Sequence, residues 1–186
     1  MCVILIGKKE EVLPYINDAQ DYNQDGSGVM WAEEGSLHIV RSLDPELFYQ
    51  KFEDRVPAGQ RVVAHFRTQS VGPVTVENIH PLFIHNTLAV AHNGTMTHMG
   101  EVVLEEEWSD SRMFAWILSR SLTEGEGIGA FDKWIRKVAG MSRLAFLDGK
   151  GELFTYGNWE QLPHNVLASN TRFRRGETDR GGRLAL

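Results

Sequence analysis

Short apolar runs alternate along this chain with stretches whose apolar residues recur at helical spacing. The short runs are rich in β-branched residues and are bounded by glycine, proline or asparagine, which is typical of strands. They predict strands over residues 3–6, 29–32, 37–40, 61–67, 87–91, 144–147, 153–156 and 166–169. Two pairs of these strands flank the turn sequences Glu33-Glu34-Gly35-Ser36 and Asp148-Gly149-Lys150-Gly151, so we expect a hairpin at each place.

The helically spaced stretches predict helices over residues 8–23, 44–54, 109–122 and 129–139. Pro14 interrupts the first of them, Pro45 suits the first turn of the second, and Ser109 suits the N-cap of the third. Residues 25–28 are typical of a turn, and residues 71–83 are irregular. Hairpins and amphipathic helices together predict a layered α+β domain with mostly antiparallel sheets.

Composition and charge narrow the class of protein. Of 186 residues, 42% are hydrophobic and 24% are charged, which is ordinary for a globular domain. The net charge of -6 and the lack of a basic stripe argue against a nucleic-acid partner. Basic residues gather only near the end of the chain, at Arg172, Arg174, Arg175, Arg180 and Arg183. We therefore expect one domain over 1–171 and a basic, glycine-rich tail over 172–186.

The apolar runs also bear on the compartment. None approaches the roughly 18 residues of a membrane-spanning helix, so no membrane partner is expected. Residues 1–7 are apolar but lack the basic leader of a signal peptide. A single cysteine excludes an internal disulfide, and the simplest setting is a reducing one, so we expect a cytoplasmic protein.

That single cysteine, Cys2, directly follows the initiator Met1. Removal of Met1 would place a free α-amino group on the residue that carries the thiol. Their ordinary pKa values, about 7.7–8.0 for the amine and about 8.5 for the thiol, both lie close to physiological pH. Cys2 is therefore a candidate N-terminal nucleophile with its own base. The alternative is a small buried hydrophobic residue that opens a strand.

Two segments at strand ends carry candidate binding groups. His65–Gly72 places Arg67 where a strand meets a loop, and a guanidinium there can hold a carboxylate through two parallel hydrogen bonds; an ordinary surface arginine is the alternative. His92-Asn93-Gly94-Thr95 is typical of a tight turn. The same segment can also aim the Asn93 amide and the Gly94 backbone N–H at one oxyanion.

Two further segments combine capping or structural residues with possible site residues. Ser109-Asp110-Ser111 suits a helix start, and Asp110 can also accept hydrogen bonds from a substrate ammonium group. Asn78-Ile79-His80-Pro81 lies in the irregular loop, where His80 either has a structural role or lines a pocket.

In their order and spacing these segments resemble the class II glutamine amidotransferase domain, also called the N-terminal-nucleophile glutaminase domain. Cys2 matches the cysteine that follows methionine in that family, and Asp25–Trp31 is similar to its glycine-rich segment. The other matching motifs are H-x-R-x-x-[ST]-x-G at His65–Gly72, N-x-H-P at Asn78–Pro81, H-N-G-x at His92–Thr95 and S-D-[ST] at Ser109–Ser111.

The resemblance implies a four-layer αββα sandwich of two antiparallel sheets, the Ntn-hydrolase fold. It implies a glutaminase in which the Cys2 thiol hydrolyses the glutamine side-chain amide through a thioester, giving glutamate and ammonia. By the same resemblance, Asn93 and Gly94 form the oxyanion hole and act with Cys2 in catalysis. The implied substrate-binding residues are Arg67 for the α-carboxylate, Asp110 for the α-ammonium, Ser70 in the loop over the substrate, and His80.

We expect no cofactor and no metal, because the spacing of His80, His85, His92 and His98 fits no ligand motif. Val3, Gln69 and Val71 depart from residues common in the family, and they change the packing beside Cys2 and the loop over the substrate. Nothing after Leu122 resembles a synthase domain, so a separate ammonia-accepting synthase subunit is the expected partner. The alternatives are a hydrolase of another γ-glutamyl amide and a non-catalytic partner-binding domain of the same fold.

Overall fold

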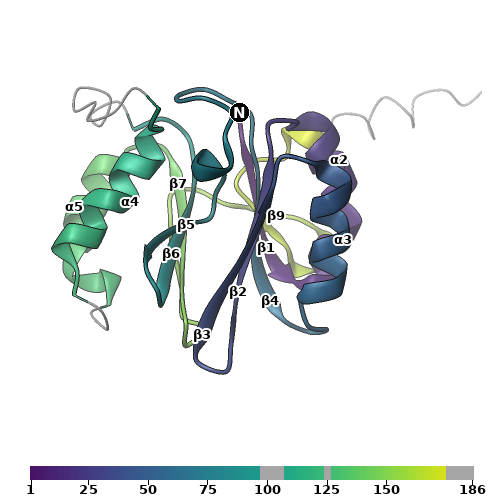
Figure 1. Ribbon diagram of the computed structural model, residues 1–186, viewed down its shortest axis with the longest axis horizontal. Coiled ribbons are helices and arrows are strands. Elements are labelled where there is room, and N and C mark those ends of the chain that lie inside the picture. Colours follow the sequence, from purple (N-terminus) through teal and green to yellow (C-terminus); the bar gives the residue numbers. More distant parts are fainter. Residues whose placement is uncertain (97–106, 124–126, 175–186) are drawn as a thin grey trace, which may run out of the picture.

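Two antiparallel sheets pack face to face between two layers of helices, as Figure 1 shows. The computed structural model describes residues 1–96, 107–123 and 127–174. The larger sheet has the order β3-β2-β4-β1-β10-β9, with β1 Val3–Lys8, β2 Ser27–Glu33, β3 Ser36–Ser42, β4 Arg61–Phe66, β9 Glu160–Gln161 and β10 Leu167–Ala168. The smaller sheet has the order β5-β6-β7-β8, with β5 Leu82–His85, β6 Leu88–Asn93, β7 Arg143–Asp148 and β8 Leu153–Tyr156.

Helices cover the outer face of each sheet. The larger sheet is covered by α1 Lys9–Val12, α2 Ile16–Tyr22 and α3 Pro45–Arg55, and the smaller sheet by α4 Asp110–Ser121 and α5 Asp132–Ala139. Short 3-10 turns complete the described chain: η1 Leu13–Tyr15, η2 Val76–Asn78, η3 Ile128–Phe131, η4 Pro163–Asn165 and η5 Arg172–Arg174. In the described ranges no helix is both long and apolar enough to cross a membrane.

The alternation of side chains along each strand produces three apolar layers. In β1, Val3 and Leu5 pack with the helices of the larger sheet, whereas Ile4 and Ile6 pack toward the smaller sheet. In β6, Ala89 and Ala91 face the larger sheet, while alternate residues face α4 and α5. The αββα arrangement predicted from the sequence is therefore confirmed.

Most predicted elements are present, with a few differences. The first helix is broken at Pro14 into α1, η1 and α2, and both predicted hairpins form. The predicted turn over 25–28 is partly wrong, because β2 already begins at Ser27. Gly28 pairs with His65 there, and a Cβ atom on it would lie 2.0 Å from the His80 carbonyl oxygen. Gly28 is needed here because the His80 backbone approaches it closely, and not because the chain turns at this residue.

Two strands were not predicted. β5 begins inside the segment expected to be irregular, directly after Pro81, and extends two residues beyond it, and β9 has only two residues. At the end of the described chain Phe173 is buried against the helices of the larger sheet. Residues 175–186 of the predicted tail lie outside the described residues, so the division at residue 172 stays a prediction.

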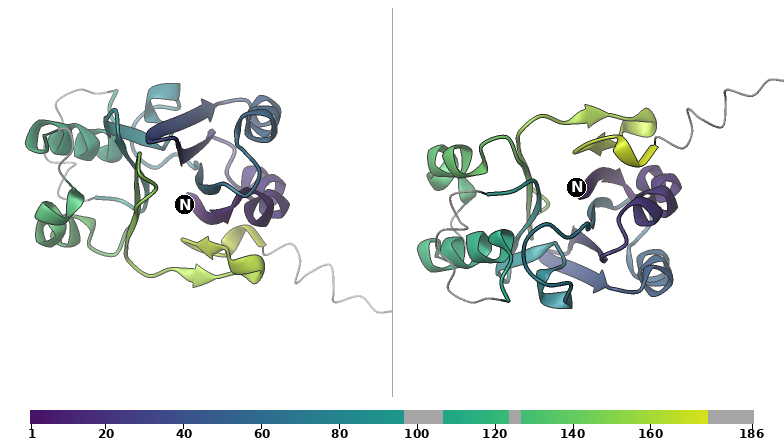
Figure 2. Two further views of the ribbon diagram at one scale, coloured as in Figure 1. Left: turned by 90° about the horizontal axis from the view of Figure 1, so that it is seen from below. Right: turned by 90° about the horizontal axis from the view of Figure 1, so that it is seen from above.

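The fold brings four distant segments to one end of the sandwich. β1 pairs antiparallel with β4, with Val3 opposite Phe66, so Cys2 and Arg67 lie one step further along neighbouring strands. β6 ends in Asn93, and α4 begins at Asp110. Both views in Figure 2 place the N-terminus centrally, between the two sheets.

Candidate active site

A small cavity lies where these segments meet, and it contains nearly all of the predicted site residues. It is lined by Cys2, Arg67, Thr68, Ser70, Val71, Asn78, His80, His92, Gly94, Ser109, Asp110 and Ser111. Asn93 does not line the cavity; its buried side chain reaches toward the larger sheet instead. The fold thus brings all of the predicted site residues except Asn93 to one cavity.

The volume of this cavity is about 20 Å³, which is enough for about one water molecule and far too little for an amino acid. The loop after β4 closes it. The Arg67 Nη2 atom donates to the carbonyl oxygens of Val71 at 3.3 Å and Gly72 at 3.2 Å. An amino-acid ligand therefore requires this loop to move outward and release the guanidinium.

The loop is also fixed from the outside. Asp25 accepts a hydrogen bond from the Gln69 backbone N–H at 2.7 Å, and the Thr68 hydroxyl donates to the Asn23 side-chain oxygen at 2.7 Å. The Gln69 side chain donates to the Gly72 carbonyl at 3.0 Å. Asn23 could not be predicted from the sequence, because its contact with Thr68 joins two segments that no local pattern relates.

Arg67 is a buried cation with an unused donor. Its side chain is 4% exposed, and its Nη1 atom has no hydrogen-bond partner among the described residues. Burial lowers the pKa of this guanidinium, while Cys2, Asp25 and Asp110 act in the opposite direction. A guanidinium keeps its charge even so, and a buried, unpaired one is suited to a carboxylate ligand.

Cys2 is half-buried and held at both ends. Its thiol donates to the Thr68 carbonyl at 3.4 Å, and its own carbonyl accepts from the Asn170 side chain at 2.8 Å. Burial raises the pKa of the thiol, opposed by the Thr68 backbone, the charged amino terminus and Arg67. The thiol is therefore protonated at neutral pH. Met1 is exposed in front of it.

Asp110 is held by the start of α4. Its Oδ2 atom accepts from the Met96 backbone N–H at 2.8 Å, and its Oδ1 atom accepts from the Ser111 backbone at 2.7 Å and hydroxyl at 3.1 Å. A carboxylate has about four acceptor positions, so it can still accept from a ligand. Ser109 caps the helix by accepting from the Arg112 backbone N–H at 3.1 Å.

Asn78 fastens the loop to that helix start. Its side-chain oxygen accepts from the Ser109 backbone N–H at 3.1 Å, and its amide nitrogen donates to the carbonyls of Glu107 at 2.9 Å and Pro73 at 3.1 Å. Every hydrogen-bonding group of this buried side chain is used. Asn78 thus has a bracing role that its place in the N-x-H-P segment did not specify.

Three buried histidines lie beside the cavity. The His65 Nε2 atom is 3.0 Å from His80 Nδ1, and the His92 Nδ1 atom is 2.7 Å from the Ser111 hydroxyl oxygen. Burial lowers the pKa of His65 to about 3 and that of His92 to about 4, and it holds the pKa of His80 well below its usual range. All three rings are therefore neutral at pH 7.

The hydrogen bonds indicate which ring nitrogens carry protons. The His80 Nδ1 atom accepts from the His92 backbone N–H at 3.4 Å, so it also accepts from His65, and the proton of His80 is on Nε2. Because Ser111 donates to Asp110, it accepts from His92. His80 Nε2 has no partner within the described chain, and His80 lines the cavity. His80 can therefore offer a hydrogen-bond donor to a ligand.

Gly94 is a position where only glycine fits. Its φ is +146°, and a Cβ atom on it would lie 2.2 Å from the Ser142 hydroxyl oxygen. The backbone after Asn93 can therefore turn sharply at the cavity wall. The Asn93 side chain donates from Nδ2 to the Ser169 hydroxyl oxygen at 2.7 Å.

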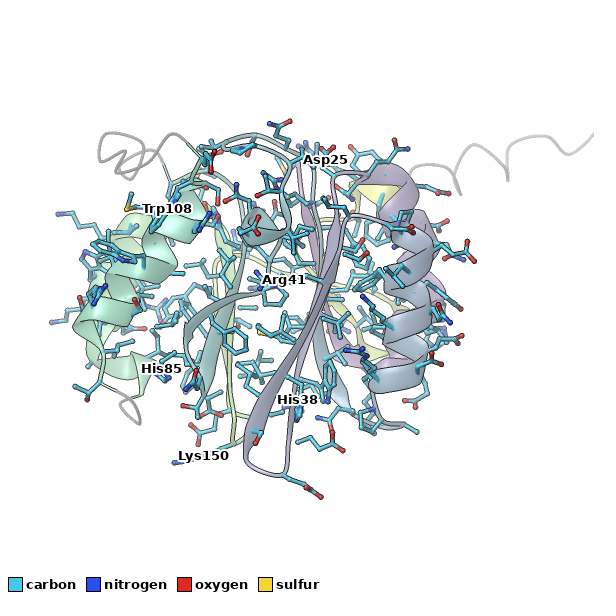
Figure 3. The ribbon with its side chains drawn as sticks, viewed as in Figure 1. Asp25, His38, Arg41, His85, Trp108 and Lys150 are labelled. Atoms are coloured by element: carbon cyan, nitrogen blue, oxygen red, sulfur yellow. The ribbon has the colours of Figure 1, made fainter. Side chains whose placement is uncertain are left out.

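Among the larger hollows, two lie away from this site. One of about 770 Å³ is lined by Lys8, Arg61 and Glu152 among others, and one of about 370 Å³ by His85 and Lys150 among others. Figure 3 shows Lys150 at the end of the molecule opposite Asp25 and Trp108. No predicted site residue lines either hollow, so size alone is a poor guide to the chemistry here.

The described residues contain no group of three histidine, cysteine, aspartate or glutamate side chains that could hold a metal ion. His98, one of the four histidines whose spacing fits no ligand motif, lies outside the described residues.

Comparison with known proteins identifies the fold. No protein-family model and no curated protein matches this sequence. The structure is similar to a glutamine phosphoribosylpyrophosphate amidotransferase from B. subtilis in complex with ADP and GMP, with a TM-score of 0.64 and 16% identity over 91% of this chain. The match covers 42% of that chain, so this protein spans less than half of its length.

A second similar structure is a glutamine aminotransferase class-II domain protein from Silicibacter pomeroyi. Its TM-score is 0.50 at 17% identity, over 90% of this chain and 87% of that one. Identities this low establish shared architecture rather than shared activity. The chain therefore has the fold of class II glutamine amidotransferase domains.

Proposed function

We propose that this protein is a class II glutaminase that releases ammonia from glutamine for a separate acceptor enzyme. The observation that carries the proposal is the convergence of Cys2, Arg67 and Asp110, from three distant segments, on one cavity. A nucleophile between a buried cation and a carboxylate suits a substrate with an α-carboxylate, an α-ammonium and a side-chain amide.

The reaction begins once Met1 has been removed. The α-amine of Cys2, acting through a water molecule, takes the thiol proton, and the thiolate attacks the side-chain carbonyl carbon of glutamine. The Asn93 amide and the Gly94 backbone N–H stabilise the oxyanion, and such a donor is commonly worth about 10²–10³ in rate. The protonated α-amine then returns that proton to the amide nitrogen, the C–N bond breaks, and ammonia leaves while the acyl group stays on the Cys2 sulfur as a thioester. Water hydrolyses the thioester, which gives glutamate and restores the thiol.

The remaining cavity residues bind the substrate. Arg67 exchanges its contacts with the Val71 and Gly72 carbonyls for the α-carboxylate, and Asp110 accepts from the α-ammonium. Ser70 moves with the loop, and His80 offers its Nε2 proton. A free catalytic thiol suits a reducing compartment such as the cytoplasm.

The direct test is glutamate release from glutamine by protein whose N-terminus mass spectrometry shows to be Cys2. We expect activity in that protein and none in Cys2→Ala. 6-Diazo-5-oxo-norleucine should add covalently to Cys2. Retained Met1 in the native protein, or equal turnover by Cys2→Ala, would contradict the proposal. A clear preference for larger γ-glutamyl amides over glutamine would show instead a hydrolase of that class.

A further inference from the structure

Ser169 connects the strand that follows Cys2 with the Asn93 side chain. Its side chain is fully buried just after β10. Its hydroxyl oxygen accepts from the Ile4 backbone N–H at 2.8 Å and lies 2.7 Å from Asn93 Nδ2. Ser169 also donates its backbone N–H to the Ile4 carbonyl at 2.9 Å. It therefore has a fixed position relative to β1.

Two hydrogen-bonding groups of Ser169 and Asn93 have no partner among the described residues. A serine hydroxyl has one proton and two acceptor positions. With Ile4 and Asn93 both donating to it, both acceptor positions of Ser169 are used, and no described group accepts its proton. Beside it, the Asn93 Oδ1 atom is buried and has no partner among the described residues. A donor and an acceptor that both lack partners thus belong to the same two side chains.

A half-turn of the Asn93 amide resolves both deficits. The oxygen and nitrogen of an amide are nearly equal in size, so the turn exchanges them without moving neighbouring atoms. The Ser169 hydroxyl then donates to Oδ1, while it still accepts from Ile4. The amide nitrogen of Asn93 then takes the buried position of Oδ1, where no described group is its partner. An N–H group at that position can attract an oxyanion, which a carbonyl oxygen there would repel.

We propose that Ser169 is the positioning residue of the oxyanion hole: its hydroxyl holds Asn93 Oδ1 and so directs the amide N–H groups toward the reacting carbonyl. This inference rests on the proposed glutaminase function. The neighbouring Asn170 supports it, because its side chain holds the Cys2 carbonyl at 2.8 Å. Two consecutive residues thereby fix the nucleophile and the oxyanion donor relative to one another.

The test compares Ser169→Ala with the wild-type protein, both with Cys2 at the N-terminus. We expect kcat for glutamine to fall by about 10- to 100-fold. This loss does not exceed that expected for complete removal of one oxyanion donor, because the Asn93 amide is still present but no longer held in place. KM should stay within about twofold. Alkylation of Cys2 by iodoacetamide, which forms no oxyanion, should keep its rate. Ser27→Ala is the matched control, since Ser27 is a buried serine of the same sheet that contacts Gln20 rather than Asn93.

A double-mutant cycle with Asn93→Ala isolates the mechanism. If Ser169 acts through Asn93, Ser169→Ala will have almost no further effect on kcat in the Asn93→Ala background. An equal effect in both backgrounds, or a loss confined to KM, would overturn the inference. If Ser169→Ala does not fold, Ser169→Thr and Ser169→Val provide a pair of equal shape that differs only in the hydroxyl, and the threonine variant alone should keep activity. Inactive wild-type protein would refute the glutaminase function itself, whereas active wild type with an equally active Ser169→Ala refutes only the role of Ser169.

Discussion

At the scale of the residue, Arg67 is a buried cation whose Nη1 atom has no hydrogen-bond partner among the described residues. The strand alternation places it on the face of β4 that also carries Val63, toward the smaller sheet. There it loses solvent, retains an unused Nη1 donor, and holds two loop carbonyls. Because the desolvation of this guanidinium has already occurred on folding, a carboxylate that binds to it adds its attraction without that further cost.

We predict that Arg67→Lys raises KM for glutamine by about 10- to 100-fold, because an ammonium cannot form the bidentate contact and a lost hydrogen bond to a charged group is worth about 1.5–3 kcal/mol. Steady-state glutamate release measures this. Arg61→Lys, an exposed arginine at the other end of β4, is the control and should leave KM unchanged. Equal KM values for the Arg67→Lys variant and the wild type would exclude Arg67 as the carboxylate ligand.

The sequence allowed some residues at the cavity to be predicted but not the residues that hold them. Cys2, Arg67 and Asp110, which line the cavity, could be proposed from the sequence because each belongs to a local motif with its own chemistry. Ser169 and Asn170 were not, since their partners Ile4, Asn93 and Cys2 are distant in the chain and a serine or asparagine after a strand carries no signal of its own. Only the pairing of β10 with β1 brings them to the site.

At the scale of the element, the start of α4 contains both a helix-stabilising cap and a residue that lines the cavity. Its N-cap, Ser109, accepts from the Arg112 backbone N–H, and the next residue is the Asp110 of the cavity. α3 begins in a comparable way, with Asp44 accepting from the Leu47 backbone N–H at 3.0 Å, but it lies on the outside of the other sheet. The two helix starts therefore form a matched pair, one near the cavity and one remote from it.

We predict that Ser109→Ala and Asp44→Ala each lower the free energy of unfolding by about 1 kcal/mol, the usual value of an N-cap. Only Ser109→Ala should also weaken glutamine binding, because it loosens the start of the helix that presents Asp110. Urea denaturation and KM measurements separate the two effects. A similar KM for both variants would mean that the cap does not position the carboxylate.

Local patterns predicted the long elements well and the short ones poorly. The Ser109 N-cap, the helix start at Pro45 and the Pro14 break follow from chemistry within a few residues. β9 has two residues, too few for any alternation to be visible, and β5 follows a proline in a loop-like composition. Strands this short are defined by the neighbours they pair with, which the local sequence does not specify.

At the scale of the whole molecule, the buried histidines make the fold sensitive to acid. His65, His80 and His92 are at most 5% exposed and neutral in the folded state, while their ordinary pKa in an unfolded chain is about 6.5. Below that pH the unfolded chain binds protons that the folded protein does not. Stability is therefore fully present above about pH 6.5 and is lost as the pH falls toward the folded pKa values of about 4 for His92 and about 3 for His65.

We predict that His65 and His92 each contribute a loss of about 2 kcal/mol between pH 7 and pH 5, with His80 adding to it in the same direction. Urea denaturation at the two pH values measures the loss. His65→Gln should reduce this pH dependence by about 2 kcal/mol, whereas His38→Gln, at an exposed histidine, should leave it unchanged. An unaltered slope in His65→Gln would show that this ring becomes protonated in the folded protein.

The position of β1 has a consequence for synthesis on the ribosome. β1 lies between β4 and β10, and the Cys2 carbonyl is held by Asn170. A growing polypeptide therefore carries the Cys2 thiol from the start but lacks the Asn170 contact with the Cys2 carbonyl until nearly the whole described chain has been translated. Unfinished chains should accordingly consume no glutamine, even where methionine aminopeptidase has already trimmed them.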